Sequence, residues 1–190
     1  MRPANPSTRF RGALTPSHPC ASTRYVVLAV SLHVSLSQPF TQAEPELFIT
    51  TGSDRGIALF DLRMSTPVRK LVMQTKTNAV AWNPIEAFVF TAASDDCNLY
   101  SFDMRQLKHA TCVHQDFVSS VMDVDYSPTG REFVAGSYDR TLRIFGHMAG
   151  HSREVYHTSR MQRVFAVRFS GDGTYVYSGS DDMNLRVWKV

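Results

Sequence analysis

The chain has 190 residues, of which 43% are hydrophobic and 19% are charged, and this composition fits one globular domain of ordinary size with a hydrophobic core. The three cysteines, at positions 20, 97 and 112, have no close spacing, so the sequence excludes a metal knuckle and a disulfide framework and favours a reducing compartment. No apolar run reaches the roughly 18 residues that a membrane span needs.

The net charge of +3 is unevenly distributed. Before Glu44 there are four arginines and no acidic residue, whereas the rest of the chain has 16 basic (20 − 4) and 17 acidic residues. The basic isoelectric point therefore comes from the N-terminal segment and is poor evidence for a nucleic-acid-binding surface.

Residues 1–39 match none of the repeats described below, and we expect them to be disordered or an atypical start. The apolar run Tyr25–Leu36 follows several arginines. It is compatible with a signal-peptide core, a transit peptide or a partial strand. A secreted or organelle-targeted protein therefore stays open as one alternative.

Four segments from residue 40 onward repeat one pattern. Small residues are followed by a serine, an acidic turn and a short alternating strand that ends in an aromatic residue. The segments are TTGSDRGIALFD (50–61), TAASDDCNLYSFD (91–103), VAGSYDRTLRIFG (134–146) and YSGSDDMNLRVWK (177–189).

The repeat has a period of about 43 residues, which is typical of a four-stranded propeller blade. An aspartate that can accept backbone N–H groups lies in each turn, six residues before the terminal aromatic. A second aromatic series marks the preceding strand. The three series are Phe60, Phe102, Phe145 and Trp188; Asp54, Asp96, Asp139 and Asp182; and Phe40, Trp82, Tyr126 and Phe169.

The pattern predicts an all-β fold, a partial β-propeller of the WD-repeat type with about four blades of antiparallel four-stranded sheets over residues 40–190. Strands such as 121–126 and 164–169 are mostly apolar, as expected between stacked blades. The usual histidine slot holds Met73, Phe117 and Arg160. We therefore expect apolar packing to replace the usual buried polar network. Four blades leave edges exposed, which predicts a fragment or pairing with another copy.

No arrangement of residues indicates catalysis, so the sequence predicts a binding scaffold rather than an enzyme. His147 and His151 are four residues apart but flank Gly150, with no further ligand at a suitable spacing. There is no Gly-rich phosphate loop and no nucleophile elbow. We expect no metal, no cofactor and no small-molecule substrate.

Two similar tripeptides follow the terminal aromatics of consecutive repeats: Asp61-Leu62-Arg63 and Asp103-Met104-Arg105. A local role is possible, with the aspartate capping the turn and the arginine covering apolar surface. Alternatively, two arginines on one rim could bind the carboxylates of a partner protein. The pattern also matches the motif by which WD proteins bind the adaptor of cullin-RING ubiquitin ligases.

A further basic stretch, REVYHTSRMQR, covers 153–163 and is predicted to be a loop between blades. It is either a solvated loop or a contact for RNA or protein, because arginine and aromatic side chains together suit phosphates and stacked bases. The candidate contact residues are Arg153, Tyr156, His157, Arg160 and Arg163.

Three strings resemble the Sof family of WD-repeat nucleolar proteins, a lineage that includes a cullin-4-associated factor. They are TNAVAWNPIEAFVFTAASDDCNLYSFDMR (77–105), VSSVMDVDYSPTGREFV (118–134) and REVYHTSRMQ (153–162). The resemblance covers about residues 40–190. The paired motif matches the family's docking motif, with phenylalanine in place of tryptophan in both copies.

The resemblance implies a scaffold in the nucleus and nucleolus that acts in small-subunit processome assembly and 18S rRNA maturation. The implied partners are processome proteins and a small nucleolar ribonucleoprotein with pre-rRNA. The alternative is a substrate receptor of a cullin-4 RING ubiquitin ligase. The family's remaining blades and its basic C-terminal tail do not occur in this sequence.

Overall fold

The computed structural model describes residues 47–190, which form fourteen strands in four antiparallel sheets, with no helix among these residues. The first sheet contains β1 (Leu47–Thr51), β2 (Gly56–Asp61) and β3 (Arg69–Val72). The second contains β4 (Thr77–Trp82), β5 (Val89–Ser94), β6 (Asn98–Asp103) and β7 (Cys112–Gln115). The third contains β8 (Val121–Tyr126), β9 (Glu132–Ser137), β10 (Leu142–Gly146) and β11 (Ser152–Tyr156). The fourth contains β12 (Val164–Phe169), β13 (Tyr175–Ser180) and β14 (Leu185–Lys189).

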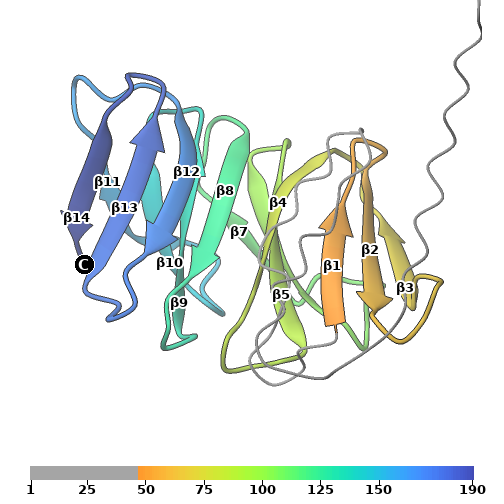
Figure 1. Cartoon of the computed structure of the whole chain (residues 1–190). Helices are drawn as coiled ribbons and strands as arrows, with labels where there is room; N and C mark the ends of the chain where they lie inside the picture. The colour runs from red at the N-terminus through yellow and green to blue at the C-terminus, as the bar shows by residue number, and fades with distance from the viewer. Residues whose placement is uncertain (1–46) are drawn as a thin grey trace, which may run out of the picture.

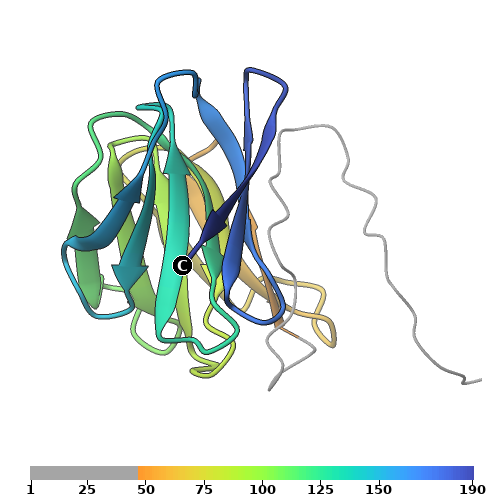
Figure 2. The same cartoon turned by 90° about the vertical axis from the view of Figure 1, so that its left-hand side faces the viewer.

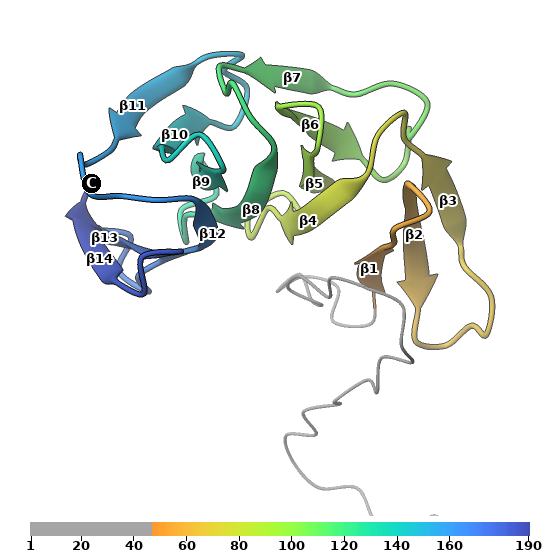
Figure 3. The same ribbon diagram turned by 90° about the horizontal axis from the view of Figure 1, so that it is seen from above.

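The sheets follow one another in chain order (Figure 1). Seen from above, they lie along an arc, with β4, β8 and β12 on its inner side and β3, β7 and β11 on its outer side (Figure 3). Each sheet is a meander in which sequential strands pair, so the fold is built from short hairpins. This arrangement confirms the predicted all-β, partial WD-type propeller.

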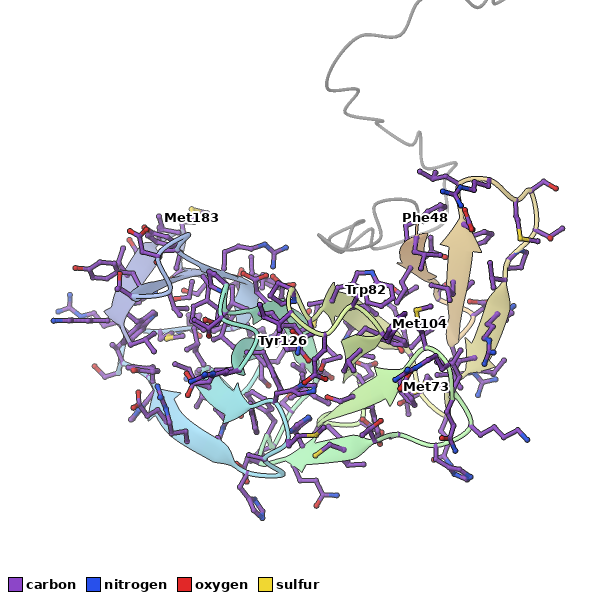
Figure 4. The ribbon with its side chains drawn as sticks, turned by 90° about the horizontal axis from the view of Figure 1, so that it is seen from below. Phe48, Met73, Trp82, Met104, Tyr126 and Met183 are labelled. Atoms are coloured by element: carbon purple, nitrogen blue, oxygen red, sulfur yellow. The ribbon has the colours of Figure 1, made fainter. Side chains whose placement is uncertain are left out.

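Three apolar cores lie between consecutive sheets. Ile57 and Leu59 pack against Trp82 and Phe90 between the first two sheets. The next two interfaces contain larger sets: Ala93, Leu99, Val124, Phe133 and Phe145 between the second and third sheets, and Val134, Leu142, Ile144, Val167 and Val176 between the third and fourth. Figure 4 shows Trp82 and Tyr126 in successive gaps of the stack. The middle sheets bury both faces, which explains why inner strands such as β4, β5 and β8 are mostly apolar.

The two middle sheets have the predicted four strands, whereas the first and last have three among the described residues. The strand predicted around Phe40, the apolar run Tyr25–Leu36 and the whole segment 1–39 lie outside the described residues. The proposed boundary between 1–39 and 40–190 therefore stays a prediction.

Candidate functional site

The connections between strands form two rims. In the four-stranded sheets, one rim carries the turns between the first and second and between the third and fourth strands. In the first sheet it carries the turn between β2 and β3, so it includes both Asp-x-Arg motifs, and we call it the motif rim. The other, the opposite rim, carries the turn between β1 and β2, the turns between the second and third strands of the other sheets, and the loops between sheets. Backbone bonds join neighbouring connections on each rim, from Met104 N to Phe88 O (2.8 Å) and from Asp95 N to Lys76 O (2.9 Å).

The four repeated aspartates lie in equivalent turns of the opposite rim. Each accepts a hydrogen bond from the amide two residues later, at 2.9 to 3.4 Å. The residue that follows each aspartate has a positive φ and is not glycine: Arg55 (62°), Cys97 (69°), Arg140 (66°) and Met183 (60°). The carboxylate thus supports a left-handed backbone conformation that these side chains otherwise disfavour.

The two Asp-x-Arg motifs form the same local turn on the motif rim. The Asp61 carboxylate accepts the Arg63 amide at 2.9 Å, and the Asp103 carboxylate accepts the Arg105 amide at 2.8 Å. The Arg105 guanidinium also pairs with Asp103 at 2.8 Å and holds the pKa of that carboxyl below its ordinary value. The aspartate therefore caps the turn in both motifs.

The second motif is also tied to its surroundings. Arg105 lies 4.6 Å from the centre of the Phe88 ring, and Arg69 of β3 donates to the Arg105 carbonyl at 2.6 Å. The Arg105 side chain remains well exposed, with 65% of its surface accessible. Because Arg69 belongs to the first sheet, this bond fixes the second motif against the sheet that carries the first.

The motif rim is also rich in exposed apolar side chains. Six of the large hydrophobic residues that are exposed lie in its turns, against two in the connections of the opposite rim. The six are Leu62, Met64, Val68, Ile85, Phe88 and Met148, and the two are Val118 and Met183. Apolar side chains grouped with arginines are typical of protein-binding surfaces.

The stretch 153–163 is not a continuous loop, and the prediction of one was wrong at its start. Residues up to Tyr156 form the edge strand β11, because they pair with β10. Arg153 pairs with Glu132 at 2.7 Å. Tyr156 packs on Trp188 with ring centres 5.5 Å apart and also donates to Glu154.

The rest of that stretch belongs to the opposite rim. His157 and Arg160 are exposed, whereas the Arg163 guanidinium lies 5.3 Å from the centre of the Tyr138 ring. The five candidate contact residues are thus divided between a strand and a loop, and Arg153, Tyr156 and Arg163 have structural partners.

A buried polar network connects the second and third sheets, where apolar packing alone was expected. Thr91 bonds to Ser101 at 2.8 Å and to the Tyr126 hydroxyl at 2.6 Å. His114 and His147 lie at the two ends, 2.9 Å from the Ser101 hydroxyl and 3.1 Å from the Tyr126 hydroxyl. The sequence alone does not reveal this network, because its residues come from four strands and a turn. In the last sheet, a simpler pair joins Trp188 to Ser178 at 2.8 Å.

Two aspartates on β8 hold the neighbouring sheet in place. Asp123 accepts the Val167 amide at 3.0 Å and pairs with Arg168 at 3.0 Å, and Asp125 accepts the Phe169 amide at 2.8 Å. Burial raises the pKa of Asp123 and raises that of Asp125 to about 6. The sequence does contain a signal for these contacts, because the otherwise apolar strand VMDVDY has carboxylates at alternate positions.

No three His, Cys, Asp or Glu side chains among residues 47–190 are grouped so that they could hold a metal ion. His151 instead pairs with Asp116 at 3.0 Å. The same part of the chain has no helix with the length and apolar character of a membrane span.

Stacked four-stranded meanders with aspartate turns define a WD-repeat β-propeller protein. The model described as "WD domain, G-beta repeat" matches residues 108–146 and 148–189. Over 151 residues, the chain is 54% identical to DDB1- and CUL4-associated factor 13 of Danio rerio, covering 80% of this chain and 34% of that protein. It is 52% identical over 153 residues to Protein SOF1 of Saccharomyces cerevisiae, covering 80% and 31%.

The human DDB1- and CUL4-associated factor 13 is 52% identical over 154 residues, covering 81% of this chain and 35% of that protein. These matches confirm the resemblance: the chain is a WD-repeat relative of the Sof type. It spans about a third of the length of the relatives that it matches.

Proposed function

We propose that the chain is a scaffold in early ribosome assembly, acting in small-subunit processome formation and 18S rRNA maturation in the nucleolus. The observation that carries this proposal is the 52% identity to Protein SOF1 over 80% of the chain. The stacked sheets support such a role, because they present two rims of rigidly held turns to protein and ribonucleoprotein partners. The role requires no catalysis.

The test is the recovery of pre-rRNA with a tagged full-length chain from a nucleolar extract. We expect small-subunit precursor RNA to be enriched over a tag-only control. The exposed Arg160 is the side chain of the 153–163 stretch best placed to contact RNA, so Arg160→Gln should reduce direct crosslinking to that RNA. Failure to recover any precursor RNA would count against the scaffold role.

A second function, substrate receptor of a cullin-4 ligase, is favoured by a different observation. The relatives named DDB1- and CUL4-associated factor 13 share about half of their aligned residues with this chain. The two Asp-x-Arg turns lie on the motif rim of consecutive sheets, among its exposed apolar side chains. A paired cationic contact within an apolar surface suits a protein adaptor.

The test replaces Arg63 and Arg105 together with alanine. We expect binding to purified DDB1 to fall by at least about tenfold, because paired arginines at a desolvated interface are frequent hot spots. Lys76→Ala with Arg160→Ala removes the same charge from the opposite rim and should leave binding unchanged. Equal binding by both double variants would exclude the motif as the docking site.

A further inference from the structure

A pocket on the motif rim lies between the turns of the second and third sheets. Its volume of about 560 Å³ falls within the range of ligand-binding clefts. Ile85 and Met148 line it and are 68% and 62% exposed. Glu86, Arg131 and the imidazole of His147 also line it.

The His147 side chain is 92% buried, with 8% of its surface exposed, and its Nε2 atom has no hydrogen-bond partner among the described residues. The nearest charged group is the Glu86 carboxylate, 3.6 Å from Nε2, and the Glu86 side chain is 52% exposed. A buried polar atom without a partner is costly, which points to a ligand at this position.

The hydrogen bonds of the buried network determine which His147 nitrogen carries a proton. Their donor–acceptor direction is set by His114. His114 Nδ1 lies 2.5 Å from the Ala149 carbonyl, which can only accept, so Nδ1 carries the proton. Burial lowers the pKa of His114 and keeps the ring neutral, so its Nε2 atom is an acceptor. Ser101, 2.9 Å away, must therefore donate to it.

Each hydroxyl in the network has one proton to donate, so the donor–acceptor direction set at Ser101 fixes the direction of every following hydrogen bond. Ser101 accepts from Thr91 at 2.8 Å, and Thr91 in turn accepts from Tyr126 at 2.6 Å. Tyr126 has then used its proton, and it accepts from His147 Nδ1 at 3.1 Å. A neutral His147 consequently has its proton on Nδ1 and presents an unprotonated Nε2 to the pocket.

The imidazole lone pair and the Glu86 carboxylate are two acceptors that face each other without a donor between them. We propose that this pocket binds a protonated lysine or arginine side chain of a partner protein, which donates to both His147 Nε2 and Glu86. The exposed Ile85 and Met148 suit the aliphatic stem of such a side chain. This site does not depend on the Asp-x-Arg motifs or on the proposed role in ribosome assembly.

Arg131 is the basic residue of the pocket lining and opposes an incoming cation. The two acceptors must therefore supply most of the attraction, and we expect a single side chain to bind in the millimolar range. Such a contact adds specificity to a larger interface on the motif rim rather than supporting a complex alone.

The first test is the imidazole tautomer of His147 in the full chain, measured by long-range ¹H–¹⁵N correlation spectra at neutral pH. We expect protonation on Nδ1 with an unprotonated Nε2. Protonation on Nε2, alone or in a doubly protonated ring that pairs with Glu86, would overturn the proposal.

The second test titrates the full chain with three capped amino acids and follows the His147 ring and Met148 methyl signals. Nα-acetyl-lysine amide or Nα-acetyl-arginine amide should shift them, and the stronger response identifies the preferred cation. Nα-acetyl-norleucine amide has a similar stem without the charge and should not. A response to norleucine equal to that of the cations, or no response to either cation, would overturn the proposal.

Glu86→Gln should weaken the response to the cation by about fivefold or more, since one charged acceptor becomes a neutral one. Glu86 is partly exposed, so this change should leave the fold intact. Asp172→Asn removes one negative charge from the turn between β12 and β13 and should leave the response unchanged. Equal binding by wild type and Glu86→Gln would refute the assigned site.

Discussion

Asp125 illustrates at the scale of one residue how a polar group serves the stacking of sheets. Its carboxylate accepts the Phe169 amide at 2.8 Å, and burial raises its pKa to about 6, above the ordinary value of 3.8. Between pH 3.8 and about 6, Asp125 therefore keeps a proton in the folded state that it has lost in the unfolded state. The stability that Asp125 contributes is present in full below about pH 4 and is lost as the pH rises through 6.

Asp125→Asn keeps an oxygen for the Phe169 amide but cannot ionise. We expect the free energy of unfolding of this variant to exceed that of the wild type by about 1–2 kcal/mol at pH 7.5 and to be close to it at pH 4. Urea denaturation at the two pH values measures the difference. Asp172→Asn controls for the loss of one surface charge, and an Asp125→Asn variant that is less stable at pH 7.5 would contradict the prediction.

Arg140 shows the conformational demand of the acidic turns. Its φ is 66°, and the neighbouring Asp139 holds the turn by accepting the Thr141 amide at 2.9 Å. Arg140→Val places a β-branched side chain in the left-handed region, so we expect the free energy of unfolding to fall by about 1–2 kcal/mol. Arg140→Gly adopts this conformation freely. In the same denaturation experiment, its free energy of unfolding should therefore exceed that of Arg140→Val by at least that margin.

At the scale of the element, the closeness of two neighbouring sheets depends on a glycine. A Cβ added to Gly136 of β9 would lie 2.6 Å from Val164 Cγ1 and 2.9 Å from Val167 Cγ1, both on β12. Gly179 has the equivalent position in β13, where the nearest atom, the Ala166 Cβ, is 4.0 Å away. The packing of β12 therefore requires glycine at position 136, whereas position 179 has room for a side chain.

Gly136→Ala should force β12 away from β9, because valine side chains have little rotational freedom. We expect it to lower the free energy of unfolding by about 1–3 kcal/mol. Gly179→Ala is the matched control and should change stability little. Equal effects of the two substitutions in chemical denaturation would show that the packing of the third and fourth sheets does not set this requirement.

At the scale of the whole molecule, the last sheet differs from the two middle sheets in having one open face, which Figure 2 views from its side of the molecule. Leu185 and Val187 of β14 are 72% and 56% exposed, whereas their equivalents in β10, Leu142 and Ile144, are fully buried. Figure 4 places Met183, in the turn before β14, at the outer end of the stack. An open apolar sheet face favours association with another surface.

Leu185→Lys with Val187→Thr should therefore reduce concentration-dependent self-association of the chain, measured by light scattering after size-exclusion chromatography. Val118→Thr changes an apolar residue that is 83% exposed but lies on the opposite rim, and it should have no such effect. A double variant that associates as strongly as the wild type would mean that this face is not responsible.

The 43-residue period was enough to predict the sheets, their order and the acidic turns. These features depend on interactions between residues close in sequence, such as the bond from the Thr141 amide to Asp139, two positions earlier. The local turns at Asp61 and Asp103 were predicted for the same reason. The edge strand β11 was taken for a loop, because three of its five residues are polar or charged and its pairing with β10 is not visible from composition.

The contacts between residues of different repeats were decided only by the tertiary structure. Asp123 bonds to an amide 44 residues away, and Thr91 bonds to Tyr126 35 residues away. Such contacts depend on which faces of two sheets meet and at what register, and an alternating pattern does not specify the neighbour. The sequence by itself therefore determined the repeating unit, whereas the packing of units determined where buried charge, the polar network and the His147 pocket lie.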